Sequence, residues 1–273
     1  MRIQFERRAC IAVLMSMPLW LTTAAMAEEI DISDEAMESF LLNAEVMGIQ
    51  QMLPGSTYPM AVELELHGTV RRAAYKYRPA DLAPTEDTVI GEPLADSYLY
   101  EVAAYRIDRE LGLGLVPVSV IRDIHAEGAL IEWIENAMTE EELRQAGDNQ
   151  GVPESLARQK AVMILFDALI LNKDRKSSDQ LVTPEDWRLH LLDHSRSFQV
   201  SDEVPEAFLS RTVSLPRALL HRLVQLNTES LTELLDGLVT AAQVEAMLRR
   251  RDRILEKIAL DREKYGDAVV FQD

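Results

Sequence analysis

Strand-like patterns are concentrated between residues 60 and 136, and helical patterns dominate the chain after residue 136. The first region alternates apolar and polar residues around one helical stretch, which is typical of antiparallel strands. The second region has helical periodicity with one short β-like insert. We therefore predict an α+β fold with two lobes. The small β-rich N-lobe spans 59–136, the larger helical C-lobe spans 137–273, and a helical extension at 28–58 precedes them.

The β-rich region has clear turn and cap signals. The segment "MAVELELHGTVRRAAYKY" predicts a hairpin that turns at "HG". The segment "SYLYEVAAYRIDRELGLG" predicts a helix capped by Ser97 and ended by Gly112 or Gly114. Two further strands are predicted in "LVPVSVIRDI" and "GALIEWIEN". Before the β-rich region, a helix that starts near Asp34 is expected to be followed by a Pro-Gly loop.

The helical region opens with a capping box formed by Thr139 and Glu142. The segment "PESLARQKAVMILFDALILN" has a wide apolar face and predicts a long buried helix. Two short β-like pieces, "DQLVT" and "WRLHLLD", come next, and the remaining sequence is helical by period and caps.

The first 27 residues have the pattern of a secretory signal peptide. Two arginines form a basic start, residues 9–25 are apolar, and Ala25-Met26-Ala27 provides a small-x-small cleavage site. A membrane-anchoring helix is the alternative, but an apolar run of about 17 residues is at the short limit for a span. We expect export and cleavage, giving a periplasmic or secreted protein without a stable membrane anchor.

The chain is strongly acidic, with 28 basic and 46 acidic side chains and a formal net charge of −18. The signal segment carries three of the basic and one of the acidic residues, so the mature chain has 25 against 45, or about −20. Nucleic acid and anionic lipid both attract basic surfaces, and both are therefore disfavoured as partners. The only cysteine, Cys10, leaves with the signal, so the mature chain has no disulfide.

Three aspartates are spaced through "LILNKDRKSSDQLVTPEDWRLHLLDHSRSF". Asp174 follows the long helix, Asp179 comes five residues later, and Asp193 ends a strand-like piece. A loop and a short hairpin can return Asp179 and Asp193 to one point, where carboxylate oxygens suit Mg²⁺ or Mn²⁺. In the β-rich region, Lys76 lies on the second hairpin strand, and Glu101 lies in the first turn of the next helix.

Each of these residues has an ordinary structural explanation when it is taken alone. Lys76 suits a solvated strand edge, and Glu101 suits the positive end of a helix dipole. Aspartates are common turn formers. His194 has no partner histidine or cysteine at the spacing of metal ligands, which argues against a zinc-type site. The order and joint spacing of the charged residues nevertheless favour a functional site.

The arrangement resembles the atypical kinase branch that includes the phosphatidylinositol kinases, the HipA-type bacterial kinases and the secretory-pathway protein kinases. The resemblance covers most of residues 60–200. It rests on "YEVAAYRIDRELGLGLVP", on "DRKSSD" in place of Asp-Arg-His-x-x-Asn, and on "DHS". The "HRD" and "DFG" motifs of ordinary protein kinases are absent. The resemblance implies a two-lobed kinase-like fold and phosphoryl transfer from ATP with Mg²⁺ or Mn²⁺ as cofactor.

The resemblance also implies a role for each charged residue. Lys76, fixed by Glu101, would neutralise the phosphates of the nucleotide. Asp179 and Asp193 would hold the metal ion. Asp174 would accept or orient the proton of the phosphate acceptor and is the candidate catalytic residue.

The strand in "LIEWIE" leads into the short connection between the lobes. Adenine would pack there, with contacts at Glu132, Trp133 and Ile134. The hairpin expected to face the phosphates has a single glycine, Gly68. Three further positions depart from the family pattern, namely Lys176 for His, Asp179 for Asn and Ser195 for Gly.

Two functions from different classes remain open. The first is an exported kinase that phosphorylates a protein or small-molecule acceptor, which the sequence does not identify. The second is a noncatalytic kinase-like module of the cell envelope, whose acidic surface recognises a basic partner. The presence of every charged residue of the site favours the first function, whereas a compartment poor in ATP favours the second.

Overall fold

The computed structural model describes residues 33–51, 60–77, 88–89, 92–93, 96–145 and 153–272. The residues Ser33–Asp273 form one compact unit. The predicted signal peptide lies outside the described residues. Within the described ranges, no helix has the length and apolar character needed to cross a membrane.

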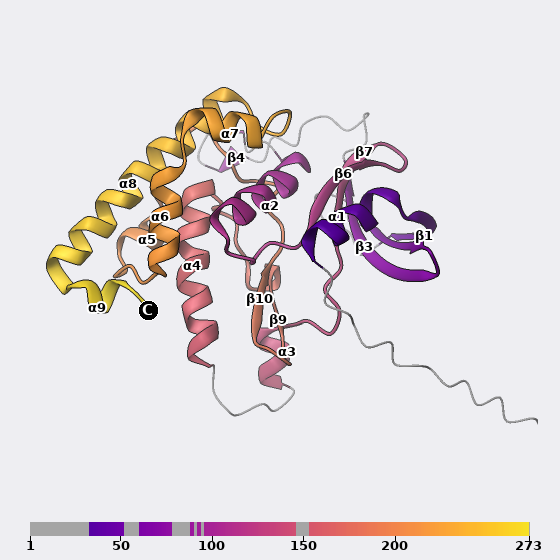
Figure 1. Ribbon diagram of the computed structural model, residues 1–273, viewed down its shortest axis with the longest axis horizontal. Helices are drawn as coiled ribbons and strands as arrows, with labels where there is room; N and C mark the ends of the chain where they lie inside the picture. The colour runs from indigo at the N-terminus through magenta and orange to yellow at the C-terminus, as the bar shows by residue number, and fades with distance from the viewer. Residues whose placement is uncertain are drawn as a thin grey trace, which may run out of the picture. The chain divides into compact units, whose positions relative to one another are not determined.

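A five-stranded antiparallel sheet with strand order β1-β2-β3-β7-β6 forms the β-rich part (Figure 1). Its strands are β1 Glu45–Gln51, β2 Met60–Leu66, β3 Thr69–Tyr77, β6 Ser119–Asp123 and β7 Glu127–Glu132. A separate two-stranded sheet pairs β4 Thr88–Val89 with β5 Glu92–Pro93. The predicted hairpin and the two later strands are therefore confirmed.

Strand β1 changes the predicted boundary of the β-rich lobe. The sequence predicts a helix and then a loop before residue 58, and helix α1 Asp34–Asn43 is present, with the Ser33 hydroxyl accepting a hydrogen bond at its start. The helix ends at Asn43 and β1 follows it, so the sheet begins at Glu45 rather than at residue 59, whereas the predicted Pro-Gly loop lies outside the described residues. The register of β1 against β2 shifts between Val46 and Gly48, and this bulge breaks the alternation that marks a strand in the sequence.

Lys76 and the Gly68 turn lie at opposite ends of β3. The turn at His67 and Gly68 lies at the start of β3, whereas Lys76 lies near its end. Gln51 pairs with Met60, and Met60 pairs with Tyr75, so the end of β1 and the start of β2 lie beside the Lys76 end of β3. The Gly68 turn therefore lies at the opposite end of β3 from Lys76, and its predicted contact with the phosphates remains a prediction.

Helix α2 Leu99–Leu111 carries Glu101 in its first turn. It ends, as predicted, at Gly112, whose φ of 63° lies in the left-handed region that glycine adopts without strain. At the other end, the Ser97 hydroxyl accepts a hydrogen bond from the Leu99 amide at 3.3 Å. The Ser97 amide donates to the Ser195 carbonyl at 2.8 Å, which ties the start of α2 to the loop after Asp193.

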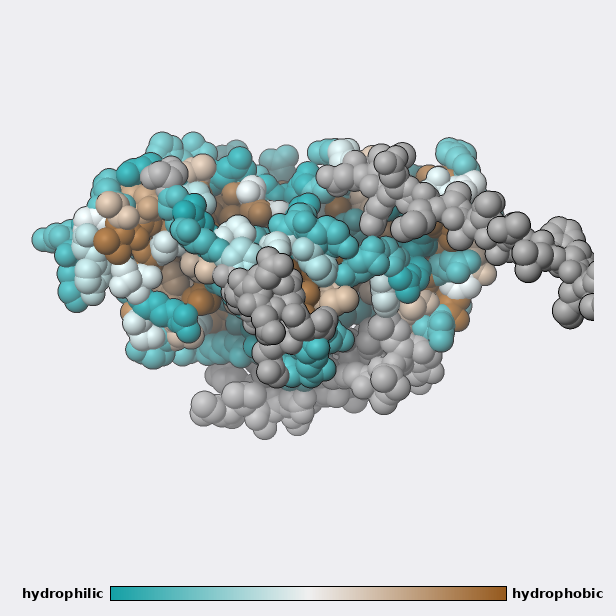
Figure 2. Space-filling view, turned by 90° about the horizontal axis from the view of Figure 1, so that it is seen from below, coloured by the Kyte–Doolittle hydropathy of each residue, from teal (hydrophilic) through white to brown (hydrophobic). Residues whose placement is uncertain are grey.

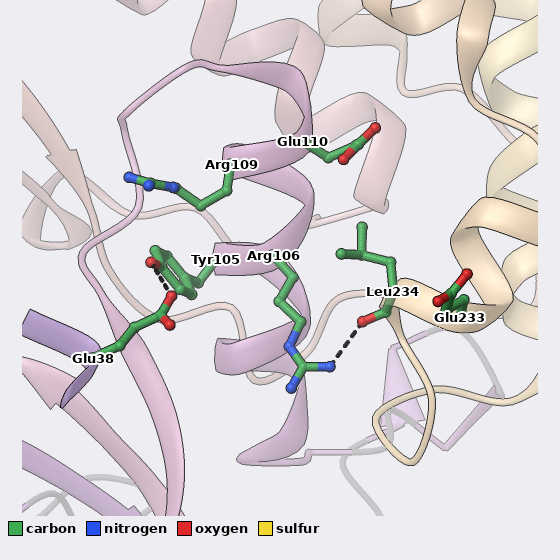
Figure 3. Close-up of a pocket in the computed structure, with 7 residues that line it drawn as sticks. All are labelled: Glu38, Tyr105, Arg106, Arg109, Glu110, Glu233 and Leu234. Carbon is green, nitrogen blue, oxygen red and sulfur yellow. Dashed lines mark hydrogen bonds between the residues drawn. The ribbon is translucent and has the colours of Figure 1, made fainter. Parts of the chain in front are cut away.

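Helix α1 braces α2 and the sheet. The Tyr105 hydroxyl donates to Glu38 at 2.6 Å, and Arg109 pairs with Asp34. On the sheet side, Arg122 of β6 donates to the Leu41 carbonyl at 2.7 Å, close to the C-terminal end of α1. A cleft of about 450 Å³ lies beside the Tyr105–Glu38 contact (Figure 3); it is lined by Glu38, Tyr105, Arg106, Arg109, Glu110, Glu233 and Leu234.

The second part of the chain is mostly helical, as predicted. Its helices are α3 Glu140–Gln145, α4 Glu154–Ile170, α5 Glu206–Leu209, α6 Arg217–Gln225, α7 Thr228–Leu234, α8 Ala241–Tyr265 and α9 Asp267–Val270. A three-stranded sheet of order β10-β9-β8 joins them, with β8 Met138–Thr139, β9 Gln180–Thr183 and β10 Arg188–Leu191. The long α8 packs against α4, whose second half is buried (Figure 1). The predicted capping box is confirmed, since Thr139 and Glu142 exchange hydrogen bonds.

The segment from Asp193 to α5 is held from several sides. The Phe198 amide donates to a carbonyl at the end of α4 at 2.7 Å. The side-chain amide of Gln243 on α8 donates to the Phe198 carbonyl at 2.7 Å and to the Tyr100 hydroxyl at 2.8 Å. Arg250, which is fully buried, donates to carbonyls of α4 and Gln199. The loop after Asp193 is therefore fixed to both α2 and the helical core.

Hydrophilic residues cover much of the face shown in Figure 2, interrupted by small hydrophobic areas. This surface agrees with the formal net charge of −18.

Candidate active site

A cavity lies between β3 and the three-stranded β10-β9-β8 sheet. Its volume of about 610 Å³ is within the usual size range of ligand pockets. Its apolar lining includes Ala74, Val116, Pro117, Ile131, Leu181, Leu191 and Leu192. Its charged and polar lining includes Arg72, Lys76, Glu101, Glu132, Glu135, Lys176, Asp179, Asp193 and His194. Apolar walls with a few charged groups are typical of a small-molecule site.

The predicted ion pair between Lys76 and Glu101 is confirmed. The Lys76 ammonium lies 2.7 Å from a Glu101 carboxylate oxygen and 3.0 Å from a carboxylate oxygen of Asp193. Both partners of the first pair are buried, with side chains 11% and 3% exposed. The structure thus brings together one residue from β3, one from α2 and one from the loop after β10.

The charges of this cluster stabilise one another. Burial acts to lower the pKa of Lys76, but the neighbouring carboxylates of Glu101 and Asp193 outweigh it and hold that pKa above its ordinary value. Burial acts to raise the pKa of Glu101, and Lys76 and His194 overcome it and hold the pKa well below its ordinary value. The pKa of Asp193 is also lowered, because Lys76 outweighs the effect of its burial. All three groups are therefore charged at neutral pH.

His194 belongs to this cluster, although the sequence analysis set it aside. It is fully buried, its amide donates to Glu101 at 3.1 Å, and its Nδ1 lies 3.2 Å from a Glu101 oxygen. Burial lowers the pKa of its imidazole. These contacts hold Glu101 in place, and a search for metal-ligand spacing in the sequence does not detect contacts of this kind.

Asp193 and Ser195 explain one departure from the family pattern. Serine in place of glycine would restrict a left-handed backbone, but Ser195 is not left-handed here, whereas its neighbour Asp193 is, with φ of 59°. Aspartate tolerates this conformation better than most residues. The Ser195 hydroxyl donates to the Asp193 carboxylate at 3.0 Å, so Ser195 supports the proposed metal residue.

The loop that carries Asp174 and Asp179 is anchored by Arg175. Its guanidinium makes two hydrogen bonds to Asp167 of α4, at 3.1 and 2.9 Å, and a third to the Leu192 carbonyl. Arg175 and Asp167 are 8% and 12% exposed. A bidentate buried pair of this kind is among the stronger polar contacts in proteins. Arg175 stands inside the "DRKSSD" motif, but its anchoring contacts were not predicted from the sequence.

Asp179 faces the same cavity as Asp193. Its carboxylate accepts hydrogen bonds from the Lys176 amide at 2.9 Å and from the Ser178 hydroxyl at 3.0 Å. Its carbonyl accepts the Leu192 amide at 2.8 Å, which connects the two aspartate-bearing loops. The predicted pair of metal carboxylates therefore lines one cavity.

These residues fit a divalent cation held together with a polyphosphate. No group of three or more His, Cys, Asp or Glu side chains in metal-binding position occurs among the described residues. Two carboxylates beside an ammonium instead suit a site in which phosphate oxygens complete the shell of a hard cation, as is usual for Mg²⁺. Asp179 and Asp193 are the residues that would hold it.

Asp174 is not among the residues that line the cavity within the described part of the chain. Its side chain is 37% exposed and lies 3.2 Å from the Lys176 ammonium and 3.5 Å from the Arg196 guanidinium. Lys176 lines the cavity, so Asp174 sits at its border behind a cationic partner. Its predicted catalytic role remains a prediction.

Glu132, Trp133 and Ile134 all line the cavity. The Glu132 amide donates to the Val118 carbonyl at 2.8 Å, and its carboxylate accepts the Val118 amide at 3.3 Å. Glu132 is thus engaged in the sheet. The predicted contact of Glu132, Trp133 and Ile134 with adenine remains a prediction.

Neither a protein-family model nor a curated protein matches this sequence. Solved structures match its fold. The crystal structure of the Golgi casein kinase with Mn/ADP bound is similar over 87% of this chain and 78% of that chain, with a TM-score of 0.60 and 14% identity. The structure of hydra Fam20 with sugar is similar over 89% of this chain and 93% of that chain, with a TM-score of 0.63 and 15% identity.

At such low identity, likeness establishes the fold and nothing finer. The chain has a kinase-like fold, in which an antiparallel sheet adjoins a larger helical part. The predicted fold class is therefore confirmed, and so is the kinase-like resemblance at the level of the fold.

Proposed function

We propose that this protein is an exported atypical kinase that transfers the γ-phosphoryl group of ATP to a protein or small-molecule acceptor. The observation that carries the proposal is the buried Lys76–Glu101 pair, which lies with Asp179 and Asp193 around one cavity. One structural neighbour, the Golgi casein kinase, is described with Mn/ADP bound, which supports a nucleotide and a divalent cation as the ligands.

In this proposal, charge and position account for most of the catalysis. Lys76 neutralises phosphate oxygens, and Glu101 and His194 keep its ammonium in place. Asp179 and Asp193 would hold Mg²⁺ or Mn²⁺, which when bound would offset the negative charge of the polyphosphate. The base lies along the apolar walls, near Glu132, Trp133 and Ile134.

Asp174 is the proposed catalytic residue. The hydroxyl oxygen of the acceptor attacks the γ-phosphorus, its proton passes to the Asp174 carboxylate, and ADP leaves. In the structure the carboxylate of Asp174 pairs with Lys176 and Arg196.

We also propose that residues 1–27 are a signal peptide and that the protein has a periplasmic or secreted location. Protease accessibility of the native protein in intact cells tests the location.

A noncatalytic binding module is the second candidate. The observation that favours it is the position of Asp174 behind Lys176, outside the cavity lining. Such a module would bind nucleotide at Lys76 without transferring phosphate.

Incubation of the purified protein with labelled ATP and either Mg²⁺ or Mn²⁺ distinguishes the two candidates. A kinase gives autophosphorylation or ATP hydrolysis, and Asp174→Ala and Asp193→Ala abolish it. Glu245→Gln, at an exposed position on α8, is the matched control and leaves it unchanged. Nucleotide binding without turnover in the unaltered chain would favour the binding module.

A further inference from the structure

Three residues form a closed contact at the cavity, away from Lys76 along β3. Arg72 Nε donates to a Glu135 carboxylate oxygen at 2.9 Å, and a second guanidinium nitrogen pairs with the other oxygen. The Arg72 guanidinium also lies over the Trp133 ring, with its carbon 4.7 Å from the ring centroid. All three residues line the cavity. We call this group the Arg72 clasp.

The strand geometry places the clasp at a definite distance from Lys76. Arg72, Ala74 and Lys76 alternate along β3, so their side chains leave the same face of the sheet, and all three line the cavity. Arg72 and Lys76 are four positions apart, and four steps along an extended strand cover about 13 Å. This separation is close to the long dimension of a nucleotide whose phosphates lie at Lys76. The clasp is therefore where the base would end.

We propose that the Arg72 clasp is the base-end wall of the nucleotide cavity and a determinant of nucleotide affinity. The inference rests on the proposed function, because it requires a nucleotide with its phosphates at Lys76. The wall presents a flat cation stacked on an indole, and Glu135 fixes the guanidinium by two hydrogen bonds. A planar base gains contact with such a surface without first ordering it, which lowers the entropic cost of binding.

Two simpler explanations of the clasp lead to different behaviour. As a surface ion pair, with side chains 50% and 36% exposed, it would contribute little to stability and nothing to ligand binding. As a gate over the cavity, it would slow the entry and the exit of ligand by the same factor and leave the affinity unchanged. A binding wall changes mainly the rate at which ligand leaves.

The test uses the full-length protein with Mn²⁺ and two probes, labelled ADP and inorganic tripolyphosphate. ADP reaches both ends of the cavity, whereas tripolyphosphate occupies only the Lys76 end. We expect Arg72→Ala to weaken ADP binding about fivefold through faster dissociation. Arg72→Lys should weaken it to a similar degree, because lysine supplies neither the planar stack nor the two parallel hydrogen bonds. The affinity for tripolyphosphate should not change.

Arg71→Ala is the matched control, because Arg71 neighbours Arg72 on β3 but leaves the opposite face of the strand. It should leave both probes unaffected. Glu135→Gln provides a second variant that keeps the shape of the side chain, and it should weaken ADP binding in the same direction as Arg72→Ala. A melting temperature measured for each variant establishes that it is folded.

Three outcomes would overturn the inference. They are ADP affinity unchanged in both Arg72→Ala and Glu135→Gln, equal changes in the association and dissociation rates, and an equal loss of ADP and tripolyphosphate binding. A wild-type protein that binds ADP while the variants behave in one of these ways leaves the proposed function standing. A wild-type protein that binds neither probe refutes the nucleotide site itself.

Discussion

Glu101 is the residue at which the parts of the candidate site meet. It accepts hydrogen bonds from Lys76 of β3 and from the amide of His194, beside Asp193. Its side chain is only 3% exposed. Removing one partner of a buried ion pair leaves the other charge poorly compensated, and this costs more than the pair itself contributes.

We therefore predict that Glu101→Gln destabilises the protein by about 3 kcal/mol and abolishes ATP turnover. Gln keeps the shape of the side chain but leaves the Lys76 charge to Asp193 alone. The free energy of unfolding in urea measures the first effect. Glu127→Gln is the control, because Glu127 is an exposed acid that accepts a hydrogen bond from the Tyr98 hydroxyl at 2.8 Å. Similar losses in both variants would contradict a special role for Glu101.

Asp108 is a second buried carboxylate, outside the cavity. It is fully buried on α2, and its carboxylate accepts the Leu115 amide at 2.9 Å. Burial raises its pKa to about 7, although backbone amides at Leu115 and its neighbours oppose the shift. Because this pKa lies above the value in the unfolded chain, the stabilising contribution of Asp108 is present at low pH and is lost as pH rises through about 7.

The Asp108→Asn variant should therefore gain stability relative to the wild type as pH rises. Between about pH 4 and about pH 7 the difference in unfolding free energy is expected to grow by up to about 1.4 kcal/mol per pH unit, because the carboxyl ionises in the unfolded chain before it ionises in the folded one, and it levels off above pH 7. Urea unfolding from pH 4 to pH 9 measures it, with the exposed Asp123→Asn as a control that should follow the wild type. Parallel curves for Asp108→Asn and the wild type would show that burial does not govern this carboxyl.

The residues of the site were predictable to different degrees. The Lys76–Glu101 pair was predicted because the order of Lys76, Glu101 and Asp193 resembles the kinase plan, in which such residues surround one site. His194 was missed because it bonds a carboxylate across 93 positions of sequence, and no local pattern signals such a contact. The clasp partner Arg72 was missed for the same reason.

At the scale of elements, α1 is the part whose function the sequence did not reveal. It holds α2 through Tyr105 and Glu38, as Figure 3 shows, and it receives Arg122 from β6. Since α2 carries Glu101, the contact of α1 with α2 helps to fix the position of the Lys76–Glu101 pair.

Replacement of Arg122 by Met should loosen α1 without removing a site residue. We expect faster amide hydrogen exchange in Asp34–Asn43 and a weaker ATP turnover, with the protein still folded. The control is Arg249→Met, at an exposed position on α8 that pairs with Glu245 at 3.8 Å. Unchanged exchange in α1 would show that its buried apolar face is sufficient to hold it.

The success of the element predictions followed the strength of the local signals. The β2–β3 hairpin, the end of α2 at Gly112 and the Thr139–Glu142 capping box each depend on residues close in sequence, and each was predicted. Strand β1 has a bulge at Gly48, and its place at the sheet edge depends on pairing with β2. Strand β1 was therefore not predicted from the sequence.

At the scale of the whole molecule, the cavity lies between the sheet and the part of the chain that follows it. A ligand that contacts Lys76 on one side and Asp193 on the other stabilises both parts at once. Binding only to the folded state adds about 2.7 kcal/mol to stability at a ligand concentration 100 times Kd.

A thermal-shift series with ATP, with and without Mn²⁺ or Mg²⁺, is expected to show stabilisation only when metal is present. Without metal, the carboxylates of Asp179 and Asp193 repel the polyphosphate. Asp193→Ala should abolish the shift, Asp179→Asn should retain it with an altered metal preference, and Asp174→Ala should leave it nearly intact. Equal shifts with and without metal, or an Asp193→Ala protein that behaves like the wild type, would contradict the site assignment.

The anchored segment between Asp193 and α5 has a consequence for control. The amide and the carbonyl of Phe198 both form hydrogen bonds with the helical core, and Arg250 donates to the carbonyl of Gln199. A stretch so firmly held has little freedom to switch between an active and a resting arrangement. We therefore expect the rate of the proposed phosphoryl transfer to depend on the concentrations of nucleotide, cation and acceptor, and not on a rearrangement of this segment.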